Sequence, residues 1–306
     1  MYRKAKNVVT IEGILAETDL KYGSFERNGR TQETIGGVIK IAVDQEINKV
    51  MTHLEVPVHM FSTKYTKNNA LNPAYTSIEK VMKEYTSIAA AGGVEGATKV
   101  RITSGTISIN SFVGRDGNIV SIPRINANFI SVATGSFNPT ATFALEGMVR
   151  SIARATDKDG IELTPAKLNV ELAVPQYTAE TAAALNVDSM TVVAISPSVI
   201  AGIEGSWEPG NCYAAQGVLN FSSRTEEIYK EVDFGEPQKV TRTTSVSELV
   251  VTAGTATPLD EEYSWTVEEI KAGVLAKRAQ LEELKNSKKA SAPKAPAATG
   301  KIDLGF

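Results

Sequence analysis

The sequence predicts a mainly β protein that contains two copies of one small barrel, followed by a helix and a polar tail. Three observations lead to this fold class. The apolar runs are short, rich in β-branched residues and separated by Gly or Asn turns, as in antiparallel sheets. Several segments of the first half recur in the same order in the second half. Near the end, Ala, Pro, Lys and Ser dominate, which is typical of a disordered linker.

The repeat consists of four pairs of segments. Residues 9–15 match 143–149, 40–43 match 171–174, 100–109 match 212–221, and 124–135 end the first unit much as 242–254 end the second. Because the order is preserved, we predict a duplicated module of roughly 120 to 135 residues. The expected domains are a first unit at 1–138, a second unit at 139–258, a helix at 259–288, and a linker with a C-terminal tip at 289–306.

The elements of the first unit follow in order. From Leu54 to Met60, apolar and polar residues alternate, which predicts a strand with one buried face. Asn28-Gly29 and Asp116-Gly117 are hairpin-turn dipeptides. A capping box at Thr76 and Glu79 predicts a helix between the third and fourth strands. A β-β-β-α-β-β order, with Gly13 where the first strand must bend, predicts an OB-fold barrel.

The second unit and the C-terminal region differ in their helices. We expect a helical stretch near 178–186, ahead of a strand at 191–196. A further helix is expected over 260–286, with a capping box at Thr266 and Glu269 and apolar residues at heptad spacing. Two interpretations of this helix remain open. It either dimerises and gives a homo-oligomer, or packs on its own barrel with Trp265 as anchor.

Charge is divided unevenly along the chain. The net charge is −3. Residues 1–138 hold 16 Lys and Arg against 12 Asp and Glu, a net +4; residues 139–258 hold 8 against 15, a net −7; the rest hold 8 of each. A basic unit beside an acidic one indicates opposite electrostatic fields and different partners.

Composition excludes several classes of protein. One Cys and two His exclude a disulfide framework and the common zinc sites. His53 and His59 would lie roughly 20 Å apart on a strand, too far to share one ion. Phosphate-loop and nucleophile-elbow motifs are absent, no apolar run is long enough to span a membrane, and Cys212 is expected to be buried and inert. We therefore predict no enzyme, no cofactor, no metal and no membrane partner.

Four segments and the C-terminus resemble bacterial and phage single-stranded-DNA-binding proteins. The successive strands of that family resemble residues 8–15, 36–43, 56–61 and 96–113, the last followed by Asp116-Gly117. The acidic, Phe-ended tip of that family is similar to residues 301–306, which include Asp303, Leu304 and Phe306. The resemblance implies a tandem, phage-type protein that coats single-stranded DNA during replication, recombination or repair. It also implies a cytoplasmic location (the host's, if phage-encoded) and recruitment of replication proteins by the tip.

Sequence-independent binding of a single strand requires cations along the phosphates and aromatic rings that stack on bases. The first unit supplies both kinds in its hairpins and on its third strand. Tyr22, Phe25, Phe61 and Tyr65 are the strongest aromatic candidates. The full set of expected contacts is Lys21, Tyr22, Phe25, Arg27, Arg30, Lys40, Phe61, Lys64, Tyr65, Lys67, Phe112 and Arg115.

Three further expectations accompany this one. RNA is an alternative ligand, because stacking and charge do not distinguish it from DNA. The acidic second unit is expected to contact proteins or support the first, so that its deletion leaves substantial DNA affinity. The rival function is a structural or adaptor protein of a virion or replisome that binds no nucleic acid.

Overall fold

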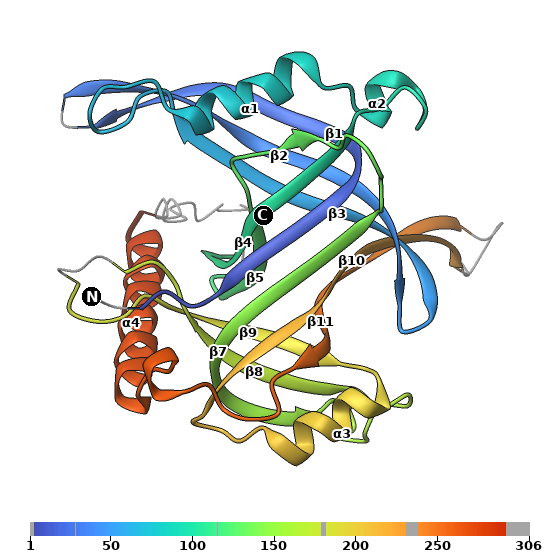
Figure 1. Cartoon of the computed structure of the whole chain (residues 1–306), viewed down its shortest axis with the longest axis vertical. Helices are drawn as coiled ribbons and strands as arrows, with labels where there is room; N and C mark the ends of the chain where they lie inside the picture. The colour runs from blue at the N-terminus through green and yellow to red at the C-terminus, as the bar shows by residue number, and fades with distance from the viewer. Residues whose placement is uncertain (1–2, 28, 115, 179–181, 231–237, 292–306) are drawn as a thin grey trace, which may run out of the picture.

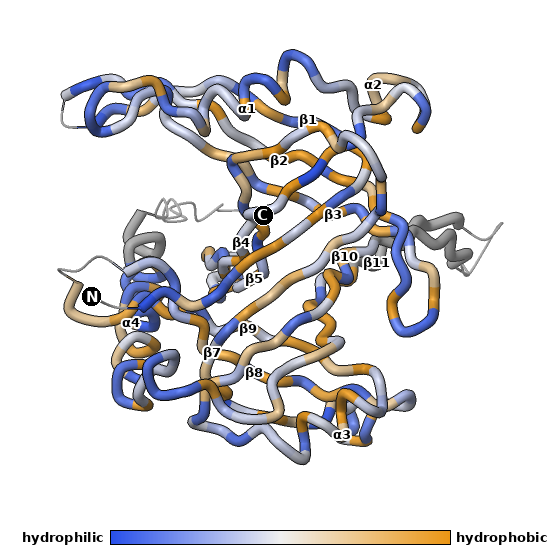
Figure 2. Tube along the Cα trace, viewed as in Figure 1, coloured by the Kyte–Doolittle hydropathy of each residue, from blue (hydrophilic) through white to orange (hydrophobic). Residues whose placement is uncertain are grey.

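The computed structural model describes residues 3–27, 29–114, 116–178, 182–230 and 238–291, with the side chains of 223–245 and of 287 onward outside the description. Two barrels lie one above the other, and a long helix stands beside them (Figure 1). Their strands form one 11-stranded sheet. Along these strands hydrophobic and polar positions alternate, as expected for barrel walls with one buried face (Figure 2).

Barrel one closes in the strand order β1-β2-β3-β5-β4-β1. β1 pairs with both β2 and β4, and β3 pairs in parallel with β5. This is the five-stranded topology of an OB fold, and it confirms the predicted fold class. The strands are β1 (Asn7–Arg27), β2 (Arg30–Ile47), β3 (Val50–Thr63), β4 (Lys99–Val113) and β5 (Ile119–Asn126), with a short β6 (Ser131–Val132) beside β4.

Barrel two repeats that order as β7-β8-β9-β11-β10-β7. β7 pairs with β8 and β10, and β9 pairs in parallel with β11. Its strands are β7 (Thr140–Arg154), β8 (Leu168–Pro175), β9 (Val187–Ala194), β10 (Cys212–Lys230) and β11 (Gln238–Gly254). Both barrels carry a register shift at the same point of the first strand, between Leu15 and Glu17 and between Val149 and Ser151.

Gly13 and Gly147 bend the first strand of each barrel. A Cβ atom at Gly13 would lie 2.4 Å from the Ala42 carbonyl oxygen, and one at Gly147 would lie 2.8 Å from the Ala173 carbonyl oxygen. Any side chain at either position would therefore force the two strands apart. The predicted role of Gly13 is confirmed, and the second copy uses the same device.

The strand pairings establish which residues are equivalent in the two barrels. The first two repeat matches are in the correct register. The third is correct from Gly105 and Gly217 onward and is shifted by one residue before that point, because Val100 and Tyr213 are the partners of Gly13 and Gly147. The fourth joins the correct strands in a shifted register: Ile125 pairs with Val58 and Leu249 with Val192. Arg124 is therefore equivalent to Glu248, and its predicted match with Arg242 is wrong. This equivalence places opposite charges at one position of the two barrels.

A helix follows the third strand of each barrel. In barrel one, α1 (Pro73–Glu84) and the short α2 (Ile88–Ala91) precede β4. The predicted start of α1 at Thr76 is wrong, because the Asn72 side chain accepts a hydrogen bond from Ala74 N at 3.1 Å and Pro73 opens the first turn.

In barrel two, α3 (Pro197–Ser206) occupies the corresponding place between β9 and β10. The helix expected near 178–186 is wrong, since the described part of that stretch is turns and irregular chain. The expected strand at 191–196 also begins and ends earlier, as β9. The two units therefore match each other more closely than their sequences indicate.

The hairpin turns are those that the dipeptides predict. Gly29 and Gly117 have φ of +69° and +77°, and β1 and β2 are joined through the pair Arg27 and Arg30. The β2–β3 turn uses Asn48 and Lys49, both with positive φ, in place of a glycine. This turn carries no Gly signal, so the pattern analysis does not identify it.

The two barrels are joined by strand pairing and by buried amides. β1 pairs with β7 from Asn7 to Glu12. Asn7 Nδ2 donates to Gln176 Oε1 of barrel two at 3.2 Å, while within barrel one the same buried amide donates to the Ile107 carbonyl at 2.6 Å and accepts from the Ile107 N–H at 2.9 Å. Gln45, also buried, binds Ala141 of barrel two in the same manner. The apolar core runs continuously through both barrels.

α4 (Val267–Ser291) packs along the junction of the two barrels, after a short 3₁₀ turn, η1 (Glu261–Tyr263). The capping box is confirmed: Glu269 N donates to Thr266 Oγ1 at 3.2 Å, and Glu269 Oε2 accepts from Thr266 N at 2.9 Å. Trp265 is buried at the start of this helix. The helix therefore packs on its own chain, with Trp265 as an anchor.

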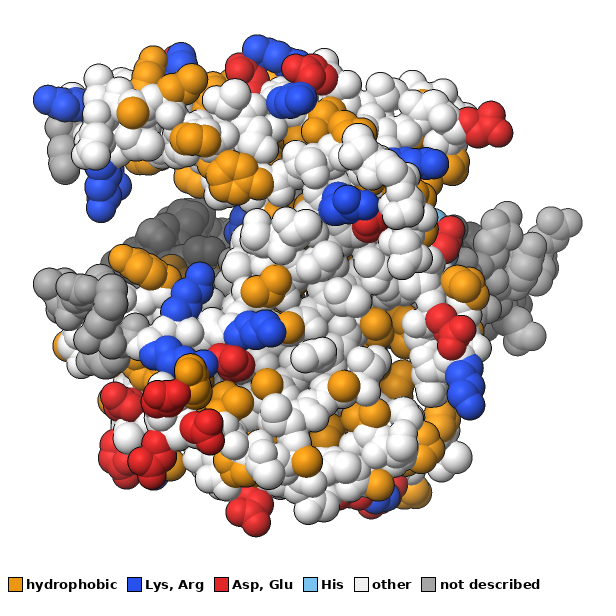
Figure 3. All heavy atoms as spheres, viewed as in Figure 1, with side chains coloured by type: hydrophobic (Ala, Val, Ile, Leu, Met, Phe, Trp, Pro, Cys, Tyr) orange, Lys and Arg blue, Asp and Glu red, His pale blue; other side chains and the backbone are white. Residues whose placement is uncertain are grey.

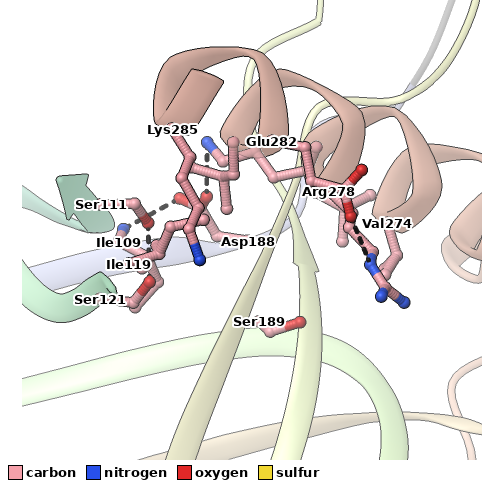
Figure 4. A pocket seen from close by; sticks show the side chains of 13 residues that line it. Ile109, Ser111, Ile119, Ser121, Asp188, Ser189, Val274, Arg278, Glu282 and Lys285 are labelled. Atoms are coloured by element: carbon pink, nitrogen blue, oxygen red, sulfur yellow. Dashed lines mark hydrogen bonds and ion pairs between the residues drawn. The ribbon is translucent and has the colours of Figure 1, made fainter. Parts of the chain in front are cut away.

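A buried carboxylate ties α4 to both barrels. Asp188 of β9 accepts a hydrogen bond from Ile109 N of β4 at 3.1 Å, and Lys277 Nζ of α4 lies 3.3 Å from its other oxygen (Figure 4). A pocket of about 440 Å³ lies beside this contact, between α4 and the two barrels. In the part of the chain that the structure covers, no helix is long and apolar enough to cross a membrane.

Candidate nucleic-acid interface

The outer face of barrel one carries several of the predicted residues. On β3, Leu54, Val56, Val58 and Met60 point into the core and are at most 1% exposed. Phe61 points the other way and is 54% exposed, as its position in the alternation predicts. Lys40 on β2 also points outward, between the buried Ile39 and Ile41. Phe61 and Lys40 point to the same side of the barrel wall as the outward residues of β1, β4 and β5. We call this side of barrel one the outer face.

Phe61 lies over a glycine of the neighbouring strand. Gly36 is its partner in the β2–β3 pair, and Lys21 is the partner of Gly36 on β1. A Cβ atom at Gly36 would approach Phe61 Cδ2 to 3.1 Å. The small residue thus leaves room for the ring to lie against the sheet with much of its surface open. An exposed ring supported in this way is available for stacking on a base.

An open groove lies between the tip of the β1–β2 hairpin and the chain that leaves β3. We call it the hairpin groove; its volume is about 980 Å³. Four predicted residues line it together: Arg27, Arg30, Tyr65 and Lys67. Tyr65 is 43% exposed. Phe25 lies next to the groove, since its pairing partner Gln32 is part of the lining.

The predicted cations fall into two groups. Lys21, Lys40 and Lys64 form ion pairs with Asp19, Glu17 and Glu33 at 2.9, 2.8 and 2.5 Å. The hydrogen bonds that Lys40 and Lys64 donate to Glu17 and Glu33 raise the pKa of both lysines. By contrast, Arg27, Arg30 and Lys67 form no ion pair with any residue that the structure describes. The uncompensated charge is therefore in the hairpin groove.

Tyr22 lies on a different face from Phe61. Its hydroxyl donates to Glu79 Oε1 of α1 at 2.8 Å, and its ring centre lies 6.5 Å from that of Tyr75. The hydrogen bond to Glu79 raises the pKa of Tyr22. Tyr22 remains 51% exposed, but it faces α1 rather than the outer face. The strand pairing thus places Phe25 and Phe61 on one side of the sheet and Tyr22 on the other, while Tyr65 lines the hairpin groove.

The second predicted hairpin is described only in part. Phe112 on β4 is 39% exposed and pairs with the exposed Val120 of β5. Ile122 lies two residues further along β5 and is also exposed, which extends the apolar part of this hairpin. Four predicted residues lie outside the part of the chain that the structure describes: Arg115 of this hairpin, and Asp303, Leu304 and Phe306 of the tip.

A polar cluster on the outer face is absent from the predicted set. It consists of His59 on β3, Arg124 and Asn126 on β5, and Ser108 on β4. Asn126 Nδ2 donates to Ser108 Oγ at 2.9 Å. Burial and the charge of Arg124 lower the pKa of His59. The polar, apolar, polar order of Arg124, Ile125 and Asn126 is the signal that could have identified it, because Ile125 is buried.

Barrel two presents a different surface at the equivalent positions. Three of its basic residues are paired with acids: Arg150 with Glu171 at 2.6 Å, Arg154 with Glu204 at 2.8 Å, and Lys167 with Glu248. Glu171 occupies the position of Lys40, and Glu248 that of Arg124. This face therefore offers phosphate little free positive charge.

Figure 3 shows how these charges are distributed on one side of the molecule. Basic and apolar side chains gather over barrel one, in the upper part of the view, and acidic side chains gather near the beginning of α4. Among the described residues, no group of three or more His, Cys, Asp or Glu could hold a metal ion. Cys212 is buried, as predicted, and its burial raises its pKa.

Comparison with known proteins gives one family and two solved structures. The model of the YorF family matches residues 6–287. Among curated proteins, none matches the sequence. The wild-type single-stranded DNA binding protein from Thermus aquaticus is similar in structure, with a TM-score of 0.48 and 12% identity, over 83% of this chain and 93% of that chain.

A deletion mutant of the same Thermus aquaticus protein has a TM-score of 0.45 and 14% identity, over 87% of this chain and 99% of that chain. At these identities and TM-scores, neither likeness assigns a function.

Proposed function

This chain belongs to the YorF family, and we propose that it binds single-stranded DNA without sequence preference. The ligand lies across the outer face of barrel one and into the hairpin groove. The observation that carries the proposal is the groove itself, in which Arg27, Arg30 and Lys67 surround Tyr65 without a carboxylate partner among the described residues. Cations that track phosphates beside a ring that stacks on bases are the two requirements for this kind of binding.

The exposed rings of the outer face support the same conclusion. Phe25, Phe61 and Tyr65 are between 41% and 54% exposed, so that much of each ring is open to a ligand. Stacking on such rings contributes about 1–3 kcal/mol per base and tolerates any base. Two or three rings with the groove cations therefore supply affinity without sequence readout.

Barrel two has a supporting role in this proposal. Its described cations Arg150, Arg154 and Lys167 are neutralised by neighbouring acids, and its strands cover an edge of barrel one. We assign strand binding to residues 1–138 and support to residues 139–258. We further propose a role in DNA replication, recombination or repair, in phage or host. The C-terminal tip would recruit replication proteins. Those parts rest on the sequence resemblance alone.

The test is a titration of a fluorescein-labelled oligo(dT) with the full chain at two salt concentrations, followed by anisotropy. Binding that weakens steeply as salt rises is expected, because counterions are released from the strand. The absence of binding at low salt would favour the structural or adaptor alternative. A parallel titration with oligo(U) compares DNA with RNA, and duplex DNA as competitor tests the preference for a single strand.

A further inference from the structure

Among the arginines whose side chains the structure describes, Arg27, Arg30 and Arg124 have no ion pair, and of these three only Arg124 is partly buried. Arg3, Arg101, Arg150 and Arg154 each have a carboxylate oxygen between 2.6 and 2.8 Å away. Arg124 has no ion pair with any described residue, although its side chain is partly buried and its Nε atom is fully covered without a hydrogen-bond partner. A partly buried cation that lacks a counter-ion is costly, so its persistence here indicates a ligand that supplies the negative charge.

The surroundings of Arg124 lie on the side of the barrel where the DNA is proposed to run. Arg124 points away from the core, because Ile125 beside it is 1% exposed. His59 lies on the adjacent strand and is paired with Asn126, two residues before the stacking candidate Phe61. Phe61 itself is tied to this region, since its N–H donates to Asn128 Oδ1 at 3.2 Å.

The equivalent position in barrel two shows the opposite arrangement. There Glu248 takes the place of Arg124, and it accepts hydrogen bonds from Lys167 and from Asn220, the counterpart of Ser108. Lys167 in turn occupies the position of Gly36. The charge at this site is thus compensated within barrel two and left open in barrel one.

We propose that Arg124 and His59 form a phosphate-binding subsite in the middle of the outer face, which holds one phosphodiester of the bound strand beside the base that stacks on Phe61. The inference rests on the proposed function. The guanidinium fork of arginine fits two phosphate oxygens, and the imidazole donates a further hydrogen bond. The Arg124 guanidinium is a cation without an ion pair to any residue that the structure describes, so its ligand must supply a negative charge and not only a hydrogen-bond acceptor. For this reason we prefer a phosphate to a base edge.

This arrangement couples binding to proton uptake. In the free protein, burial and the Arg124 charge hold the pKa of His59 below its ordinary value. A phosphate between the two side chains favours the imidazolium form, so the pKa rises on binding and affinity increases as pH falls from 7 toward 5. The charged groups nearest on the outer face are Lys40 with its partners Glu17 and Glu55, and Asp19 with Lys21.

The experiment compares oligo(dT) binding by the full chain, Arg124→Gln, Arg124→Lys and His59→Gln across salt and pH. Arg124→Gln should reduce the slope of log affinity against log salt by about 0.7, the contribution of one phosphate contact in a single strand. Arg124→Lys should keep the slope and weaken binding. His59→Gln should abolish the gain in affinity below pH 7. His53, the other histidine of β3, pairs with Asp44 of β2, and His53→Gln should retain the gain.

The possible failures are distinct. If the unaltered chain does not bind oligo(dT), the proposed function fails. If it binds and Arg124→Gln leaves both affinity and slope unchanged, the subsite is wrong and the proposed function stands. A loss confined to oligonucleotides of one base, among dT, dA and dC, would also overturn the proposal, because it would mean that Arg124 contacts a base. Circular dichroism of each variant checks that it is folded.

Discussion

The stacking role of Phe61 can be tested by its replacement with alanine. The ring is 54% exposed and contributes little to the core, so Phe61→Ala should fold with nearly unchanged stability. One stacked base contributes about 1–3 kcal/mol. Since 1.4 kcal/mol corresponds to a tenfold change in affinity, the variant should bind oligo(dT) roughly 5 to 150 times more weakly.

The salt dependence of binding distinguishes stacking from charge. Phe61→Ala removes no cation, so the slope of log affinity against log salt should equal that of the unaltered chain. Anisotropy titrations at three or more salt concentrations measure both quantities. Tyr177→Ala is a matched control, because this ring is 77% exposed but belongs to barrel two. Its affinity should be unchanged.

Two results would refute this reasoning. If Phe61→Ala binds within about twofold of the unaltered chain, a change below the range expected for a stacked base, the ring is not a platform. If Tyr177→Ala weakens binding as much as Phe61→Ala does, the strand does not follow barrel one. In either case the outer face would have to be reassigned.

Three other predictions concern charge, stability and pH. Replacing both Arg27 and Lys67 with Gln should lower the salt slope by about 1.4, measured by the same titrations, and an unchanged slope would remove the hairpin groove from the binding path. Asn7→Ala should lower the free energy of unfolding by about 1–3 kcal/mol in urea denaturation, because it leaves the N–H and C=O of Ile107 unpaired; an unaffected midpoint would contradict that role. The hydrogen bonds from Arg101 and Asn138 lower the pKa of Glu12 from 4.5. Because this carboxylate binds fewer protons when folded, its stabilising effect is present above pH 4.5 and is lost as pH falls further, so Glu12→Gln should show a weaker loss of stability on acidification.

The sequence predicts much of this fold because its signals are local. Alternation along β3, the positive-φ glycines of two hairpins, and the bend at Gly13 each depend on a few neighbouring residues. The order of these signals is enough to define the barrel topology. The start of α1 is missed since its cap, Asn72, lies one turn before the capping box that the pattern favours.

The candidate site is harder to predict because it depends on distant contacts. The register shift between Leu15 and Glu17 inserts one extra residue into β1 and reverses the side on which every later residue of the strand faces. That reversal places Tyr22 toward α1 and Phe25 on the outer face, and nothing in the alternation of the sequence marks it. Similarly, the ion pairs of Lys40 and Lys64 and the isolation of Arg124 become visible only when the strands are assembled.

The pairing of β1 with β7 makes each barrel the cover for an open strand edge of the other. A fragment that ends at residue 138 would leave the backbone of Asn7–Glu12 unpaired along one side, and such an edge readily recruits strands from other molecules. Loss of the second barrel would then cause aggregation even if that barrel never touches DNA. The duplicated chain is best understood as one cooperative folding unit, in which one copy is free to bind because the other completes its sheet.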